Sequence, residues 1–257
     1  MTLWVDRCTP ELEDAHWMLA QMEVLLEVQR KGGIQLGEEG YLTHPKDGFD
    51  RAITMSAWVD HPTTSSGVLG AKWVSSRVAN LPDLPRGRSI TMLNDGSTGL
   101  PVLCFDGTDL SNARTAIFAC AAIARLISPW GRWGGTVGLL GAGRVHEWQA
   151  IYMHQLWPGI HLTVFDPDTK RAAEFAKLFG ADIALNWQEA IEGADVVSCA
   201  TAGAEPGWVP DDLVFTADMW INTSLRDVES HFFSRFPLVV VDDLELAMQQ
   251  RTPFHRA

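Results

Sequence analysis

The residues best suited to chemistry begin with a glycine turn that joins an apolar run, residues 136–140, to a helical pattern. A strand, a tight turn and a helix N-terminus in this order can hold a dinucleotide pyrophosphate, because free N–H groups and the helix dipole attract the anion. Gly141 allows the turn, and Gly143 lets the backbone approach the phosphates. A chance glycine-rich turn is the alternative. The residues expected to bind the cofactor here are Gly141, Ala142, Gly143, Arg144 and Val145.

An acidic residue supports the dinucleotide interpretation. A second apolar run, His161–Phe165, ends in Asp166, which lies 25 residues after Gly141. A carboxylate at this place binds ribose hydroxyls and repels a 2′-phosphate, so the sequence predicts NAD rather than NADP. His146 occupies the position of the third fingerprint glycine, so the packing of helix on strand has to accommodate a larger side chain.

Polar residues also follow two later apolar runs. Ligands of open α/β sheets bind beyond the carboxyl ends of the strands. Thr201 follows residues 196–200 and Ser224 follows residues 219–223, so both are expected to line the cofactor groove. Asp227 comes just after them and is placed to act as a general base beside the nicotinamide. Capping of a following helix is the alternative role for Asp227.

The first half of the chain offers cations for an anionic substrate. The chain has 20 Lys and Arg against 32 Asp and Glu, yet several cations fall within one short stretch, and arginine forks bind carboxylates well. Lys72 stands out because an apolar strand surrounds it, and a buried lysine needs a partner. Solvated strand ends paired with surface acids are the alternative. The candidate substrate residues are Lys72, Arg77, Arg86, Arg88 and, on the following helix, Arg114.

Two patterns of elements must position these residues. In the first, a helix that starts near Thr9 and stops at residues 31–33 precedes a loop over 34–50 with room for one short strand. Strand-like runs follow, and a helix capped by Ser111 extends to about Ile127. The runs predict an antiparallel meander and cover residues 52–59, 68–75, 89–93 and 100–105.

From residue 136 strands alternate with helices. Three helices are expected: one starts at Arg144, one follows the capping residue Asp168, and one starts at Trp187. Alternation of this kind predicts an α/β fold, a Rossmann-type doubly wound parallel sheet after an antiparallel α+β domain. Strands are expected at 136–140, 161–165, 182–185, 195–200, 219–223 and 238–241. The predicted domains are 1–131 and 132–243, with a short tail over 244–257.

Composition excludes several classes of function. The net charge of −12 argues against nucleic acid as a partner, because phosphate binding needs a basic face. No apolar run approaches the roughly 20 residues of a membrane span, and no signal peptide opens the chain, so a cytoplasmic protein without a membrane partner is expected. The 4 cysteines lack metal-ligand or disulfide spacing, and the pairs Asp211-Asp212 and Asp242-Asp243 have no further ligands nearby, so no metal site is expected.

Several short segments, in order and spacing, resemble the ornithine cyclodeaminase/mu-crystallin family over roughly residues 50–245. They are Ala71-Lys72-Trp73-Val74-Ser75-Ser76, Leu84-Pro85-Arg86, Leu93-Asn94-Asp95 with Thr98-Gly99, Asp106-Gly107-Thr108, Ala113-Arg114-Thr115-Ala116, Gly141-Ala142-Gly143, and Asn222 five residues before Asp227. Segments 75–76, 84–86, 224–227 and 241–243 most resemble the NAD-dependent oxidoreductases of 2,3-diaminopropionate biosynthesis, which oxidatively split N-(1-amino-1-carboxyl-2-ethyl)-glutamate.

The resemblance implies a first domain that binds substrate and forms a homodimer through its sheet, and then an NAD-binding Rossmann domain. It implies Lys72 and Arg114 at the substrate carboxylate and Asp227 at the amine, which makes Lys72 and Asp227 the catalytic candidates. Members usually carry an arginine near the position of Thr43, and they continue past Asp243 with a helical segment that returns to the first domain, whereas this chain stops at Ala257. We therefore expect one carboxylate ligand and one pocket wall to be missing or replaced.

The leading interpretation is oxidation at a carbon that bears nitrogen. NAD⁺ takes hydride from the Cα of an N-substituted, anionic amino acid, Asp227 receives the amine proton, and water hydrolyses the imine to an amine and a 2-oxo acid. A cyclodeaminase of the ornithine or lysine type and a ketimine reductase are the alternatives within the family. A non-catalytic protein of mu-crystallin type that binds a nicotinamide cofactor is the alternative of another class.

Overall fold

The computed structural model describes residues 3–5, 10–44, 47–60, 66–77, 84–127, 133–201, 207–210, 212–224 and 227–248. The chain divides into two compact units, Met1–Phe118 and Ala119–Ala257. The division falls inside helix α2 (Thr108–Leu126), whereas the sequence places the domain boundary after this helix, near residue 131. Residue 131 lies outside the described residues, and that boundary stays a prediction.

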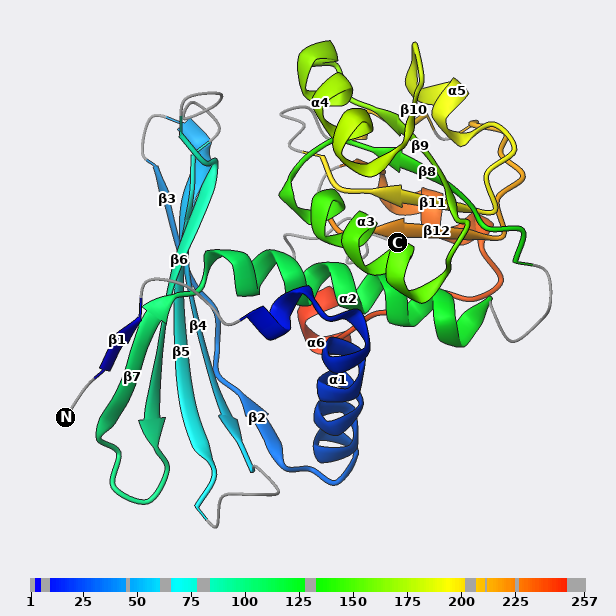
Figure 1. Ribbon diagram of the computed structural model, residues 1–257. Helices are drawn as coiled ribbons and strands as arrows, with labels where there is room; N and C mark the ends of the chain where they lie inside the picture. The colour runs from blue at the N-terminus through cyan, green and yellow to red at the C-terminus, as the bar shows by residue number, and fades with distance from the viewer. Residues whose placement is uncertain are drawn as a thin grey trace. The chain divides into compact units, whose positions relative to one another are not determined.

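The first unit is built on a seven-stranded sheet (Figure 1). Its meander is antiparallel, as the sequence predicts, and consists of β4 (Asp47–Val59), β5 (Val68–Ser76), β6 (Gly87–Asp95) and β7 (Pro101–Asp106). β2 (Ile34–Leu36) and β3 (Gly40–His44) both pair antiparallel with β4, and β1 (Leu3–Val5) pairs parallel with β7. Residues 34–50 thus form more strand than expected, because β2 and β3 both pair with β4 and β4 itself begins at Asp47.

The two main helices of this unit start elsewhere than the sequence suggests. A 3₁₀ turn, η1 (Pro10–Glu13), precedes α1 (Ala15–Arg30), and the Asp14 carboxylate caps α1 by accepting hydrogen bonds from the His16 and Trp17 amides. Thr9, the expected start, lies outside the described residues. Ser111 lies within α2, where the Asp106 carboxylate instead accepts the Thr108 amide at 2.9 Å.

The second unit contains a five-stranded parallel sheet in the order β10-β9-β8-β11-β12. Its strands are β8 (Thr136–Leu140), β9 (His161–Phe165), β10 (Asp182–Ile183), β11 (Val196–Cys199) and β12 (Met219–Asn222). Renumbered within the unit, this is the order 3-2-1-4-5 of a Rossmann sheet, and the prediction of a parallel α/β sheet is confirmed. The strand expected at 238–241 is wrong: those residues form no strand, and Leu238 and Val240 remain 66% and 61% exposed.

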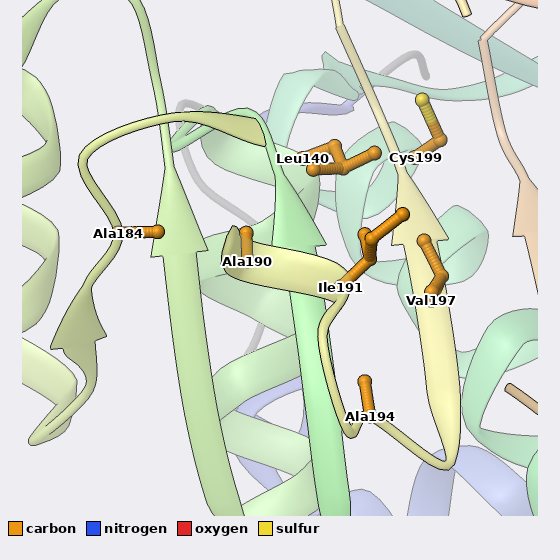
Figure 2. Close-up of a cluster of buried hydrophobic side chains, with 7 residues drawn as sticks. All are labelled: Leu140, Ala184, Ala190, Ile191, Ala194, Val197 and Cys199. Carbon is orange, nitrogen blue, oxygen red and sulfur yellow. The ribbon is translucent and has the colours of Figure 1, made fainter. Parts of the chain in front are cut away.

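Helices lie on both faces of this sheet. Val197 and Cys199 point to the face that carries α5 (Trp187–Ile191), in the buried cluster that Figure 2 shows. Ser198, between them in β11, points to the other face, where it contacts His146 and Gln149 of α3 (Arg144–Leu156). The alternation along one strand therefore places α3 and α5 on opposite faces, as in a doubly wound fold. The other helices of the described ranges are α4 (Thr169–Phe179), η4 (Ser230–Arg235) and α6 (Leu244–Ala247).

Candidate functional site

The parallel sheet gathers the expected cofactor residues at one edge. β8, β9, β11 and β12 run in the same direction, so the segments that follow them leave the sheet at its carboxyl edge. Those segments carry the glycine turn at 141–143, Asp166, Thr201 and Ser224. Ligands of open α/β sheets bind beyond this edge, so the fold gives the predicted residues a common place.

The two glycines of the turn meet different requirements. Gly141 has a φ of +106°, and a Cβ there would lie 2.7 Å from the Ala200 carbonyl oxygen, so the backbone itself needs glycine. Gly143 is the N-cap of α3 with a φ of −94°, and a Cβ there would meet nothing within 4 Å. The first N–H groups of a helix have no intrahelical acceptor. Space for an anion therefore lies where Gly143 meets the start of α3.

Asp166 is fixed against this turn. Its carboxylate is 8% exposed, accepts the Ala142 amide on Oδ2 at 2.8 Å and accepts the Asp168 amide on Oδ1 at 2.9 Å. The Arg171 guanidinium lies 3.9 Å from Oδ2. Each carboxylate oxygen can accept a further hydrogen bond, so the pair remains able to bind two ribose hydroxyls.

Asp227 joins the segments that follow β11 and β12. The residue is 1% exposed, and its Oδ1 accepts the Trp208 indole N–H at 2.9 Å. The hydroxyls of Thr201 and Ser224 also donate to this carboxylate. Ser224 Oγ in turn accepts the Thr201 amide at 3.1 Å and lies 3.4 Å from the Cys199 carbonyl oxygen. The carboxylate is buried, accepts three hydrogen bonds and is set at the carboxyl edge.

The first unit brings together Lys72 and Arg114. Lys72 Nζ lies 3.4 Å from the Ser111 hydroxyl of α2, one turn before Arg114. Burial and, to a smaller extent, the neighbouring Arg114 cation together lower the pKa of Lys72 to about 8, while Glu39 partly opposes both. Two cations in a partly buried place provide the charge that a carboxylate ligand needs.

The other predicted cations do not join this pair. Arg77 forms an ion pair with the buried Asp50, with Nε 3.0 Å from Oδ2. Arg88 is exposed on the opposite sheet face, because it pairs with Ser75 while Lys72 pairs with Thr91. Arg86 lies five positions from Thr91, a rise of about 16 Å. The expectation of one pocket lined by the whole stretch is therefore wrong for Arg77 and Arg88, since side chains alternate along a strand, and the role of Arg86 stays a prediction.

Four further residues bear on the candidate residues of the two units, and the local sequence does not indicate them as such. Arg51 pairs with Thr43 and lies on the sheet face of Lys72, because Met55, four residues further along β4, pairs with Lys72. Glu39 acts on Lys72, Trp208 donates to Asp227, and His146 contacts the glycine turn through its ring. The one advance signal is His146 itself, a polar residue at a fingerprint position that should be small.

Within the described ranges, no three His, Cys, Asp or Glu side chains come close enough together to hold a metal ion. In the same ranges, no helix combines the length and the apolar character needed to cross a membrane.

Comparison with known proteins identifies a family whose profile matches most of the chain. The sequence profile of the ornithine cyclodeaminase/mu-crystallin family matches residues 18–221. An ornithine cyclodeaminase of Brucella abortus is 28% identical over 167 residues, which are 63% of this chain and 46% of that protein. One of Agrobacterium fabrum is 28% identical over 170 residues, with the same coverage. The chain thus spans about half the length of the curated relatives it matches.

Solved structures agree with this result. CmnK is 25% identical with a TM-score of 0.85, over 99% of this chain and 79% of CmnK. A probable ornithine cyclodeaminase from Bordetella pertussis Tohama I is 23% identical with a TM-score of 0.72, over 96% of this chain and 77% of that one. A Thermococcus litoralis Δ1-pyrroline-2-carboxylate reductase, solved with NADH and L-proline, is 23% identical with a TM-score of 0.65, over 79% and 63%. At 23% identity the last two likenesses show the fold.

Proposed function

Because the chain belongs to the ornithine cyclodeaminase/mu-crystallin family, we propose that it is an NAD-dependent oxidoreductase that acts on the C–N bond of an N-substituted amino acid. The observation that carries the proposal is the Lys72–Arg114 pair, a cationic place for a substrate carboxylate in a chain whose second unit has a Rossmann fold. The glycine turn and Asp166 support NAD as the cofactor, since the turn leaves space for a pyrophosphate and the carboxylate disfavours a 2′-phosphate.

In the proposed reaction, bound NAD⁺ supplies the acceptor for the hydride of the substrate Cα. Lys72 and Arg114 hold the substrate carboxylate, and Asp227 receives the amine proton. Asp227 can accept it once the Ser224 hydroxyl turns to the Cys199 carbonyl oxygen, 3.4 Å away, because that rotation frees one carboxylate oxygen. Water then hydrolyses the imine to an amine and a 2-oxo acid.

The finer proposal is a substrate with more than one carboxylate, as in 2,3-diaminopropionate biosynthesis. Arg51 supports it: this guanidinium lies on the sheet face of Lys72 and across the ladder from Thr43, near which relatives carry an arginine. We propose that Arg51 replaces that arginine as the second carboxylate ligand. A cyclodeaminase of the ornithine type is the second candidate, because the curated relatives carry that name.

One assay separates these activities. The protein is incubated with NAD⁺ and N-(1-amino-1-carboxyl-2-ethyl)-glutamate, or with ornithine or lysine, while NADH absorbance and amino-acid consumption are followed. Net NADH formation supports the oxidoreductase. Loss of ornithine without net NADH supports the cyclodeaminase, and oxidation of added NADH by a cyclic imine supports a ketimine reductase. Cofactor binding without turnover of any of these would favour a non-catalytic binding protein.

Substrate capture should weaken above about pH 8. The pKa of Lys72 is lowered to about 8, so the free enzyme loses this cation as the pH rises through that value, and a carboxylate then loses its partner. kcat/KM is expected to fall on the alkaline side with an apparent pKa near 8. Lys72→Arg keeps the charge to much higher pH and should remove this limb. A limb unchanged by Lys72→Arg would assign the titration to another group.

The cofactor preference should depend on Asp166. Titration of the wild type with NADH and NADPH is expected to show tighter binding of NADH. Asp166→Ala removes the carboxylate that disfavours a 2′-phosphate, so it should weaken NADH binding and narrow the preference. Asp168→Ala, which removes the cap of α4 and leaves the Asp166 carboxylate in place, is the matched control. Tighter binding of NADPH by the wild type would contradict the assignment.

We also propose that the first unit forms a homodimer through its sheet. On the face opposite Lys72, Leu69, Trp73, Ile90 and Met92 are 39%, 48%, 47% and 37% exposed, an apolar surface unusual for a monomer. Light scattering should give about twice 28.4 kDa. Ile90→Glu should yield monomers, whereas Leu178→Glu, at a 72% exposed residue of α4, should not. A wild-type monomer at micromolar concentration would refute the proposal.

A further inference from the structure

The histidine at the third fingerprint position is tied to the phosphate-binding turn. His146 is fully buried in α3, and its Nδ1 donates to the Gly141 carbonyl oxygen. Its Nε2 lies 3.1 Å from the Ser198 hydroxyl of β11, and Ser198 Oγ lies 2.9 Å from the Gln149 side-chain amide. A chain of buried polar groups thus runs from the middle of the sheet to the glycine turn.

The peptide between Gly141 and Ala142 is held from both sides. The carbonyl and N–H of a trans peptide point in opposite directions. The carbonyl oxygen accepts from His146, and the N–H donates to Asp166 Oδ2 at 2.8 Å. These two bonds leave the peptide plane little freedom to rotate, and that plane directs the backbone into Gly143 and the N-terminus of α3.

The direction of each proton in the chain follows from the donors available. A carbonyl oxygen only accepts, so Nδ1 carries a proton. Burial lowers the pKa of His146 to about 4 despite the Gly141 bond and the charges of Asp166 and Asp227, so the ring is neutral at neutral pH. Nε2 therefore accepts from the single Ser198 proton. In the structure Gln149 Oε1 faces the Ser198 hydroxyl at 2.9 Å, and Gln149 Nε2 has no hydrogen-bond partner among the described residues. A half-turn of this amide lets Nε2 donate to Ser198 Oγ and leaves the Ser198 proton to His146.

We propose that His146 is a positioning residue, which sets the plane of the Gly141–Ala142 peptide and thereby the geometry of the phosphate-binding turn. A third fingerprint glycine allows close packing of helix on strand. In this chain the same position carries a neutral imidazole in one tautomer, which is anchored on β11 through Ser198. The consequence for dinucleotide affinity rests on the proposed function, whereas the effect on the peptide plane does not.

Three substitutions of His146 separate the effect of its hydrogen bond to the Gly141 carbonyl oxygen from the effect of the volume of its side chain. An asparagine amide can take the place of Nδ1 and donate to Gly141, whereas a glutamine amide takes the place of Nε2 and reaches Ser198. We expect hydrogen exchange of the Ala142 amide, followed by NMR, to stay within about threefold of wild type in His146→Asn and to be about tenfold faster in His146→Gln and His146→Ala. The NADH dissociation constant should follow the same order. His154→Gln, on an exposed histidine in the last turn of α3, is the control.

The outcomes distinguish the positioning role of His146 from the proposed function of the protein. Equal exchange and equal NADH affinity in the Asn and Gln variants, or changes that merely follow the melting temperature, would overturn the inference. If the Ala142 amide exchanges in the expected order among the variants but the protein binds neither NADH nor NADPH, the positioning role of His146 is supported and the proposed function is refuted. The expected order in both measurements supports both.

Discussion

Asp227→Asn is expected to lower turnover by about two or more orders of magnitude while the protein still binds NADH. The amide keeps the shape of the carboxylate but cannot receive the amine proton, and loss of a general base typically costs a factor of about 10²–10⁴. The effect should appear in kcat and kcat/KM together. Steady-state kinetics on the best substrate of the activity assay, with NADH titration of the same preparation, measure it.

A control is needed because Asp227 also holds its neighbours together. The carboxylate accepts bonds from Trp208, Thr201 and Ser224, so its loss could act through the fold alone. Thr223→Val is the control, because it removes a hydroxyl of the same segment that donates to the Cys199 carbonyl at 3.0 Å and not to Asp227. Near-normal turnover of Asp227→Asn would show that Asp227 is not the base. A loss of activity accompanied by loss of NADH binding and a lowered melting temperature would show that Asp227 is a structural residue.

Gly143→Ala should abolish most dinucleotide binding and leave the fold intact. A Cβ at Gly143 meets nothing within 4 Å in the protein, so the methyl group costs little stability, but it stands where the pyrophosphate would approach the N-terminus of α3. We expect NADH to bind at least about tenfold more weakly, because even one poorly made charge-assisted hydrogen bond costs about 1.5–3 kcal/mol. Fluorescence titration and thermal unfolding of the variant provide the two readings.

Gly138→Ala is the matched contrast within the same motif. Its Cβ would lie 2.2 Å from the Ala190 carbonyl oxygen of α5, a backbone atom that cannot move aside. We therefore expect the free energy of unfolding to fall by about 1–3 kcal/mol. A Gly143→Ala protein that bound NADH like wild type would place the pyrophosphate elsewhere and would remove the main support for the cofactor site.

Local patterns predicted most of the fold, and tertiary pairing explains the exceptions. The parallel strands, the Asp168 cap and the Gly141 turn depend on neighbours in sequence, and all are found. Helix α2 begins at Thr108, whose amide donates to the Asp106 carboxylate. Asp106 lies in the preceding strand, whereas the sequence favours Ser111, a residue inside the helix, as the cap. Residues 238–241 have the apolar character of a strand, but they pair with no strand among the described residues, and Leu238 and Val240 stay exposed.

The sequence predicts individual candidate residues, but it does not predict which of their side chains lie together. The sequence indicated Lys72 and Arg114, but alternation along the strands, which separates Arg88 from Lys72, becomes certain only with the register known. The Arg51 placement is a cross-strand relation and leaves no trace in local sequence. The role of His146 depends on Ser198, 52 residues later in the chain.

Helix α2 has a consequence for recombination between relatives. The compact units divide between Phe118 and Ala119, in mid-helix, and the later residues Ala119, Cys120 and Ile123 are buried. A chimera spliced after the end of α2 would transfer the parallel sheet of the second unit without the half of α2 that belongs to that unit. A splice inside α2 must keep the number of helical residues unchanged, because each inserted or deleted residue rotates the rest of the helix by about 100° around its axis. Exchange of the second unit among such proteins is therefore expected to succeed at matched positions within α2 and to fail when the splice follows this helix.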